Sequence, residues 1–257
     1  MNRIMDQGVI VGCDLHQQWM LPWWWRHYST HNSYPVVFMD FGMSEEARSW
    51  CKKRGECLSL SNFYPLSSEK IISPSTKALW ERRYGKGFWI RRQAWFKKPF
   101  SLLQCPFSVG IWIDIDCQVN CDLEALFQCI HLGAEIGICK DRNEIIDFIL
   151  PGEIHYSSGV IAFRKDSPIL QQWVDLSIQE EQNLPGDEET LSRAIFTFRP
   201  NLVELPPTYN WCWSHSPNEN VIIRHFSGGQ GKIELLNHFT PQDPTESLLL
   251  LQSLKSL

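Results

Sequence analysis

The chain has 257 residues, of which 43% are hydrophobic and 21% are charged. A chain of this length suits one large α/β domain or two small ones and can bury a sizeable core. With 12 Trp and 14 Phe, its composition excludes disorder as a description of the whole chain. A net charge of −5 argues against a dedicated nucleic-acid-binding protein, because binding to phosphates requires a basic surface.

The cysteines and the apolar runs bear on the cellular compartment. The nine cysteines include no C-x-x-C pair, which disfavours a zinc site, and their odd number and wide spread disfavour a disulfide framework. We therefore expect reduced thiols in a cytoplasmic protein. The longest apolar runs are far shorter than the roughly 20 residues that span a bilayer, and residues 1–7 lack the apolar stretch of a signal peptide. We expect no transmembrane segment.

The first part of the chain alternates predicted strands with predicted helices. Three short apolar runs bounded by turn-forming residues are predicted strands: 8–13, 35–42 and 57–60. A tryptophan-rich segment at 16–31 has the length of a helix. Ser44, followed by two glutamates, is typical of a helix start, and this second helix is expected to end near Arg54. The alternation predicts parallel βαβ units.

The rest of the chain continues this pattern. A basic and aromatic segment at 88–103 is predicted to be helical, and it precedes an apolar strand at 109–116. Further predicted elements are strands at 153–164 and 221–225, helices at 168–181 and 187–196, and a Leu-rich tail at 248–257 that suits a docked terminal helix. We expect one three-layer α/β domain whose central sheet is mixed and mostly parallel, with ligands bound at the carboxyl ends of the strands.

The Asp114-Ile115-Asp116 tripeptide carries the strongest chemical signal. A buried strand that ends in two carboxylates places hard oxygen ligands at the edge of the sheet where ligands bind. Such ligands suit Mg²⁺ or Mn²⁺, and the metal could in turn hold a diphosphate. The alternative is a strand-end turn in which one aspartate caps the next segment.

A second candidate segment follows the predicted strand at 221–225. Gly228 and Gly229 allow a close approach of the backbone to a phosphate, and Lys232 supplies a positive charge. His225 could complete a mixed oxygen and nitrogen coordination shell. The alternative is a flexible loop with a solvated lysine and a hydrogen-bonded histidine.

Two more segments place polar groups beside predicted elements. Ser158 lies just ahead of an apolar strand and could hydrogen-bond sugar hydroxyls, or it could belong to a turn. Asp187 and Glu188 open a predicted helix, where carboxylates are favoured by the helix dipole even without a catalytic role.

In this order, the motifs resemble those of GT-A glycosyltransferases, near the family that contains glycogenin and the bacterial lipopolysaccharide galactosyltransferases. The resemblance covers residues 9–232: an initial strand followed by Asp14, the Asp-x-Asp strand end, a hydroxyl-Gly-Val strand at 158–160, an Asp-Glu helix start, and a His-x-x-Gly…Lys segment. It implies a single GT-A-type, Rossmann-like domain over residues 1–257. Its parts would be a nucleotide-binding half at 1–120, an acceptor and sugar half at 121–240, and a tail helix at 241–257.

The resemblance also implies an activity. A metal-dependent glycosyltransferase would move a sugar from a nucleotide-diphosphate sugar, expected to be a UDP-sugar, to an acceptor hydroxyl on a saccharide, lipid or protein. The anomeric configuration would be retained. Asp114, Asp116 and His225 would bind the divalent metal, Mn²⁺ or Mg²⁺, which bridges the diphosphate.

The remaining roles implied by the resemblance concern the donor and the chemistry. The expected donor-binding residues are Gly12, Cys13, Asp14, Lys97, Asp114, Ile115, Ser158, Gly228, Gly229 and Lys232. Among these, Asp14 would contact the nucleoside, and Lys232 would hold the departing phosphate. Asp187 and Glu188 are the expected catalytic residues and would face the donor sugar or the acceptor hydroxyl.

Two other functions fit parts of the sequence. A haloacid-dehalogenase-like phosphatase also uses a strand followed by Asp-x-Asp, but here Gln118 and Leu191 stand where its motifs require other residues. A non-catalytic protein that binds nucleotide sugars or carbohydrates could stack tryptophans at 23–25 and 211–213 on sugars, although packing explains them as well. The basic residues at 82–98 suit a solvated helix face, an acidic acceptor or peripheral contact with an anionic membrane.

Overall fold

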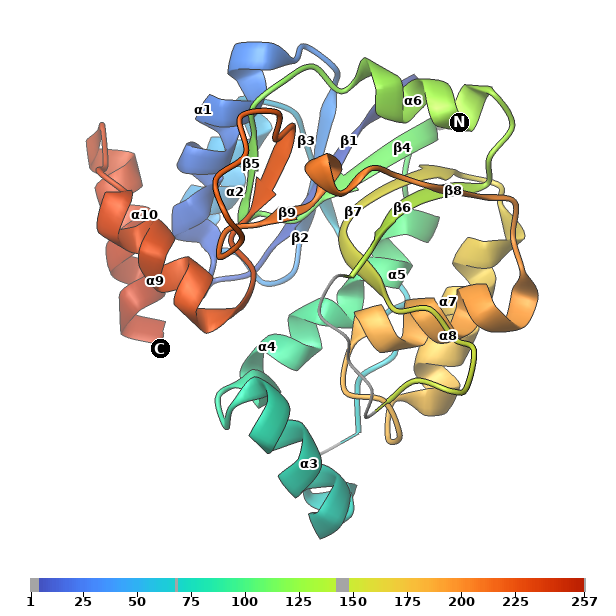
Figure 1. Ribbon diagram of the computed structural model, residues 1–257. Coiled ribbons are helices and arrows are strands. Elements are labelled where there is room, and N and C mark those ends of the chain that lie inside the picture. The colour runs from blue at the N-terminus through green and yellow to red at the C-terminus, as the bar shows by residue number, and fades with distance from the viewer. Residues whose placement is uncertain (1–4, 68, 142–147, 257) are drawn as a thin grey trace.

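The computed structural model describes residues 5–67, 69–141 and 148–256, and its centre is a seven-stranded sheet (Figure 1). The strand order is β3-β2-β1-β4-β7-β6-β8. These strands are β1 (Met5–Cys13), β2 (Val36–Asp40), β3 (Glu56–Ser59), β4 (Phe107–Ile113), β6 (Ile136–Lys140), β7 (Tyr156–Arg164) and β8 (Leu202–Glu204). Neighbouring strands run parallel except where β7 pairs with β4 and β6. The prediction of a mixed, mostly parallel sheet is confirmed.

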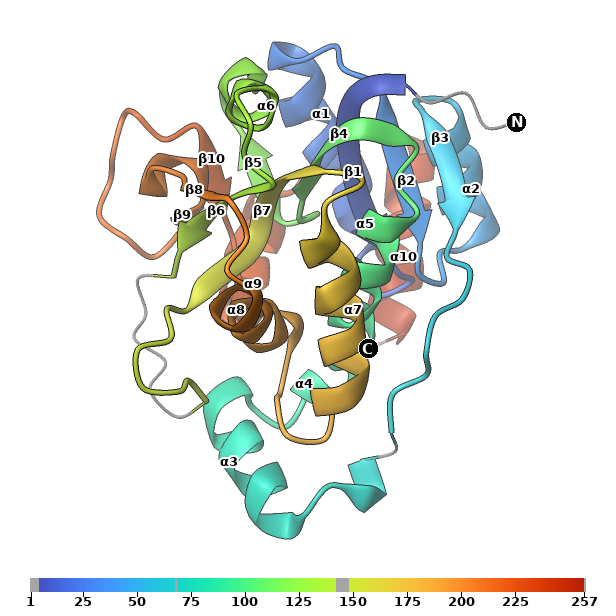
Figure 2. The same cartoon turned by 90° about the vertical axis from the view of Figure 1, so that its right-hand side faces the viewer.

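Helices cover both faces of the sheet (Figures 1 and 2). One face carries α1 (Leu21–His31), α2 (Glu45–Lys52) and α6 (Glu124–His131), and the other carries α5 (Lys97–Leu103), α7 (Pro168–Glu180) and α8 (Asp187–Phe198). The alternation of side chains along β1 explains the three layers. Val9 and Val11 pack with the helices of the first face, whereas Ile10 packs with those of the second.

The predicted helical segment at 88–103 is two helices. Helix α4 (Phe88–Trp95) ends at Phe96, where α5 begins. Pro99 lies in the first turn of α5 and has no N–H to donate to the carbonyl of Trp95, so the backbone favours a new helix start over a continuous helix. Helix α3 (Pro74–Tyr84) has no counterpart in the prediction and projects with α4 beyond the sheet (Figure 1).

The C-terminal part of the chain lies at the left of the molecule in Figure 1, whereas α3 lies at the bottom. Helix α10 (Pro244–Ser256) contacts α2 and the short 3-10 helix η1 (Gln18–Met20). Two further 3-10 helices, η2 (Glu69–Ile71) and η3 (Pro207–Tyr209), lie in connections. Across the described residues, we find no helix with both the length and the apolar character needed to cross a membrane.

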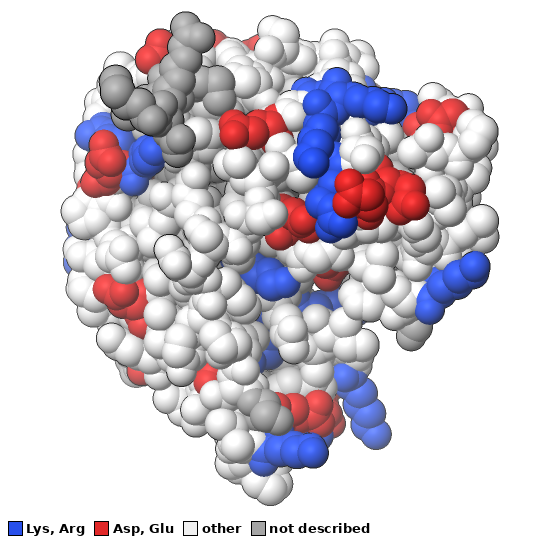
Figure 3. All heavy atoms as spheres, turned by 180° about the vertical axis from the view of Figure 1, so that it is seen from behind, with Lys and Arg blue, Asp and Glu red and all other residues white. Residues whose placement is uncertain are grey.

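Two basic side chains of the 82–98 segment are buried, so the solvated helix face, one of the three interpretations of this segment, does not describe all of it. Arg92 and Lys98 are buried, and the guanidinium of Arg92 donates to the carbonyl of Pro185 at 3.0 Å. On the face shown in Figure 3, Lys and Arg are interspersed with Asp and Glu. The basic run is therefore partly a structural feature of the interior.

Candidate active site

The chain passes from the central sheet into a second, three-stranded sheet at the Asp-x-Asp motif. That sheet consists of β5 (Cys117–Val119), β10 (Ile223–His225) and β9 (Trp211–Cys212). The N–H of Asp114 donates to the carbonyl of Gly159 at 2.8 Å, and the N–H of Cys117 closes a turn onto the carbonyl of Asp114 at 3.0 Å. Cys117 then pairs with His225 across the antiparallel strands. This pairing brings Asp116 next to His225.

The imidazole of His225 lies within 4 Å of both aspartates of the Asp-x-Asp motif. Nε2 of His225 lies 3.3 Å from Oδ1 of Asp116 and 3.8 Å from Oδ2 of Asp114. Neighbouring ligands of an octahedral Mg²⁺ or Mn²⁺ ion, each about 2.1 Å from the metal, are about 3 Å apart. The spacing and the oxygen and nitrogen donors therefore fit a divalent cation. Ligand atoms of Asp116, His225 and Cys117 lie within 4.8 Å of one another, but burial raises the pKa of the Cys117 thiol, which points to the carbonyl of Gly159.

The two aspartates differ in their protonation equilibria. Burial alone would raise the pKa of Asp116, but the positive charges of Lys232 and His225 outweigh it and hold the pKa well below its usual range. Burial raises the pKa of Asp114, and the charge of Asp116 adds to the shift, although Lys98 opposes it. Asp116 is therefore the aspartate that remains a carboxylate over the wider pH range.

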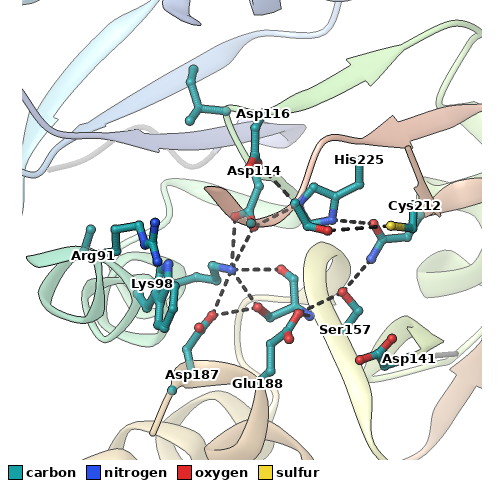
Figure 4. A pocket seen from close by; sticks show the side chains of 18 of the residues that line it. Arg91, Lys98, Asp114, Asp116, Asp141, Ser157, Asp187, Glu188, Cys212 and His225 are labelled. Carbon is teal, nitrogen blue, oxygen red and sulfur yellow. Dashed lines mark hydrogen bonds and ion pairs between the residues drawn. The ribbon is translucent and has the colours of Figure 1, made fainter. Parts of the chain in front are cut away.

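Lys98 is the central cation of the site (Figure 4). Its Nζ lies 3.0 Å from Oδ1 of Asp114 and 2.8 Å from Oδ2 of Asp187. It also donates to Oγ of Ser158 at 2.7 Å. Burial alone would lower the pKa of Lys98, but the two carboxylates raise it above its ordinary value. This ammonium thus connects α5, the end of β4, the start of β7 and the first turn of α8.

Ser158 and Glu188 complete the wall below this lysine. The hydroxyl of Ser158 donates to Oδ2 of Asp187 at 2.7 Å, and its N–H donates to Oε1 of Glu188 at 3.0 Å. Burial raises the pKa of Glu188 to about 7, with a further increase from Asp187 that the nearby His155 partly opposes. Glu188 can therefore exchange a proton near neutral pH.

The glycine-rich segment is the start of a helix and not a loop. Helix α9 (Gly228–His238) begins at a glycine whose φ of 75° lies in the left-handed region that favours glycine. Its first N–H groups have no intrahelical partners, and the positive end of the helix dipole favours an anion there. Lys232, one turn into the helix, reaches back to Oδ2 of Asp116 at 2.6 Å. The described structure therefore holds this lysine in an ion pair.

These groups line a cavity of about 420 Å³. The predicted residues in its lining are Gly12, Asp114, Ile115, Asp116, Ser158, Asp187, Glu188, His225, Gly228, Gly229 and Lys232. Three others lie outside the lining. Cys13 is buried in the core, Asp14 accepts the N–H of Gln17 at 3.0 Å, and Lys97 donates to the carbonyl of Phe41 at 2.7 Å.

The cavity also holds residues that were not among the predicted donor-binding, metal-binding or catalytic residues. Lys98, adjacent to the predicted Lys97, lines the cavity and contacts Asp114, and Asn210 contacts His225. The guanidinium of Arg91 faces the first turn of α9, since Nη1 lies 3.5 Å from where a Cβ on Gly229 would be. Trp211 also lines the cavity, whereas Trp24 belongs to the core. The sequence gave a signal for the basic segment that contains Arg91 and Lys98 and for the tryptophans at 211–213, but none for Asn210.

The fold is that of the GT-A glycosyltransferases, as expected. GlyE of Streptococcus pneumoniae superposes with a TM-score of 0.60 and 15% identity over 97% of this chain, which spans 61% of GlyE. The galactosyltransferase LgtC, solved with donor and acceptor sugar analogues, gives a TM-score of 0.60 and 12% identity over 94% of this chain and 99% of LgtC. Mouse xyloside xylosyltransferase 1 superposes with a TM-score of 0.54 and 14% identity, over 86% of this chain and 97% of its own chain.

Comparisons at the level of sequence add no relative. No protein-family model matches the chain, and no curated protein matches its sequence. The structural neighbours named above are all glycosyltransferases, so the fold gives no support to the phosphatase alternative.

Proposed function

We propose that this protein is a metal-dependent glycosyltransferase that moves a sugar from a UDP-sugar to an acceptor hydroxyl with retention of configuration. The observation that carries the proposal is the contact between Asp116 and His225, at 3.3 Å, in a cavity that the first turn of α9 also lines. A cation site and a helix N-terminus that line the same cavity suit the negative charges of a diphosphate.

The residues of the cavity take distinct roles in this proposal. Asp114, Asp116 and His225 hold Mn²⁺ or Mg²⁺, and the bound ion supplies Lewis-acid stabilisation of the departing diphosphate. Lys232 and the free N–H groups of α9 stabilise the same negative charge. Lys98 and Asp187 shape the pocket for the donor sugar.

Glu188 has a pKa suited to exchanging a proton with the acceptor hydroxyl. Its carboxyl lies in the lining of the cavity beside Ser158, and its pKa of about 7 allows both protonation states near neutral pH. It would face the donor sugar or the acceptor hydroxyl. The acceptor class, whether saccharide, lipid or protein, is set by the outer part of the cavity.

Titration calorimetry with UDP, with and without Mn²⁺, tests the donor site. We expect binding that depends on Mn²⁺, is lost in Asp116→Ala and is kept in Asp166→Ala, which changes an exposed aspartate outside the cavity lining. A panel of UDP-sugars then tests for sugar release. No binding of UDP or GDP with Mn²⁺ would reject the proposal, and binding without turnover of any donor would favour a nucleotide-sugar-binding protein.

A further inference from the structure

A chain of hydrogen bonds links His225 to Glu188 across the cavity. Nδ1 of His225 lies 2.9 Å from Oδ1 of Asn210, whose Nδ2 donates to Oγ of Ser157 at 2.9 Å. The hydroxyl of Ser157 donates to Oε1 of Glu188 at 2.8 Å. His225, Ser157 and Glu188 belong to β10, β7 and α8 and point toward one another in Figure 4.

The direction of these bonds follows from the Glu188 end. Oε1 also accepts the N–H of Ser158 at 3.0 Å, so this oxygen is an acceptor whether or not Oε2 carries a proton. The single hydroxyl proton of Ser157 goes to Glu188, so its oxygen must accept from the amide of Asn210. The carbonyl oxygen of Asn210 then faces His225 and can only accept, which requires a proton on Nδ1.

This arrangement leaves the other ring nitrogen for the metal. Nε2 of His225 faces the carboxylates of Asp114 and Asp116 at 3.8 and 3.3 Å. A histidine ligand binds a metal through one ring nitrogen while the second is held as an N–H donor by a neighbouring acceptor, which fixes the tautomer and the ring orientation.

We infer that Asn210 and Ser157 are positioning residues that hold His225 with Nε2 turned to a divalent cation. The inference rests on the proposed function, because it requires that His225 bind a metal. It also accounts for the polar contacts that Asn210 makes from the segment before β9, far from the Asp-x-Asp motif in sequence. Among the described residues, the side-chain hydrogen bonds of Asn210 and Ser157 go to His225, to Glu188 and to each other, and not to Asp114 or Asp116.

Titration of the full chain with Mn²⁺ alone, followed by the electron paramagnetic resonance signal of the free ion, tests this role without an activity assay. Asn210→Leu removes the acceptor and is expected to weaken Mn²⁺ binding by about ten- to a hundredfold. Asn210→Asp keeps an oxygen acceptor for Nδ1–H and is expected to retain at least wild-type affinity. Asn183→Leu makes the same change at an exposed position outside the cavity lining and serves as the control.

A double-mutant cycle distinguishes positioning from general damage to the fold. If Asn210 acts through His225, Asn210→Leu causes no further loss of affinity in a His225→Ala background. Nitrogen-15 NMR of the labelled histidines is expected to show a proton on Nδ1 of His225 in the wild type. Equal losses in both backgrounds, failure of the Asn210→Asp rescue, or a bare Nδ1 would each overturn the inference.

The same titration separates this inference from the proposed function. If Asp116→Ala weakens Mn²⁺ binding and Asn210→Leu does not, the positioning role is wrong and the metal site stands. If neither substitution changes the affinity, the metal site itself is wrong.

Discussion

Lys98 and Asp187 form a buried ion pair in which Nζ lies 2.8 Å from Oδ2, and this pair joins α5 to the first turn of α8. The same ammonium contacts Asp114 at 3.0 Å. One cation therefore balances two carboxylates that come from different parts of the chain. In a cavity that also gathers Asp116 and Glu188, this balance offsets part of the cost of burying the two carboxylates.

Replacement of Lys98 is expected to destabilise the protein. Lys98→Met leaves two buried carboxylates without their partner, and we expect a loss of about 3–5 kcal/mol in the free energy of unfolding. Lys97→Met is the matched control: the neighbouring ammonium donates to the carbonyl of Phe41, so a loss of about 1 kcal/mol is expected. Urea unfolding followed by circular dichroism measures both. Equal losses would show that Lys98 is not the central cation.

Gly159 is expected to be required for the position of His225. A Cβ built on Gly159 would lie 2.5 Å from Cε1 and Nδ1 of the imidazole, so Gly159→Ala must displace the ring. We expect at least a tenfold loss of Mn²⁺ affinity with a cost in stability of about 1–3 kcal/mol. Gly87→Ala, where a Cβ meets nothing within 4 Å, is the control. Unchanged Mn²⁺ binding in Gly159→Ala would contradict the metal-binding role of His225.

Glu188 makes stability depend on pH in a defined direction. Its pKa in the folded protein, about 7, exceeds the ordinary value of 4.5. The folded state therefore binds this proton more tightly than the unfolded state, and protonation of Glu188 stabilises the fold. The resulting stabilisation is present below about pH 4.5 and is lost as the pH rises to about 7. Relative to Glu188→Gln, the wild type should thus lose up to about 3 kcal/mol between pH 4.5 and 8.

Urea unfolding of both proteins across this pH range measures the difference. Glu219→Gln, at an exposed position outside the cavity lining, controls for the loss of a carboxylate elsewhere. If the difference between wild type and Glu188→Gln does not change with pH, Glu188 does not titrate as its surroundings indicate.

Replacement of Lys232 is expected to weaken the binding of UDP without weakening the binding of Mn²⁺ alone. Its Nζ lies 2.6 Å from Oδ2 of Asp116 and competes with a cation for that carboxylate, so Lys232→Met should bind Mn²⁺ alone at least as tightly as the wild type. Binding of UDP with Mn²⁺ should fall by about ten- to a hundredfold, because a charge-assisted hydrogen bond to phosphate is lost. Calorimetry of the variant and of Lys86→Met, an exposed control, measures both affinities. Unchanged UDP binding would remove Lys232 from the phosphate site.

The sequence by itself determined the local parts of this protein. The strand before Asp114, the helix start at Asp187 and the capped start of α2 at Ser44, whose side chain accepts the N–H of Ala47 at 3.2 Å, all follow from neighbouring residues. Hydrophobic periodicity and capping act within a few residues, so they can be recognised along the chain. The order of strands and helices was accordingly predicted for most of the central sheet.

The tertiary structure decided which distant residues meet. The choice of Lys98 over Lys97 depends on the face that α5 turns to the sheet, and the contact between Asp116 and His225 depends on the pairing of β5 with β10. The role of Asn210 depends on both sheets at once. Strand register and helix rotation are set by packing between segments far apart in sequence, which a local pattern does not encode.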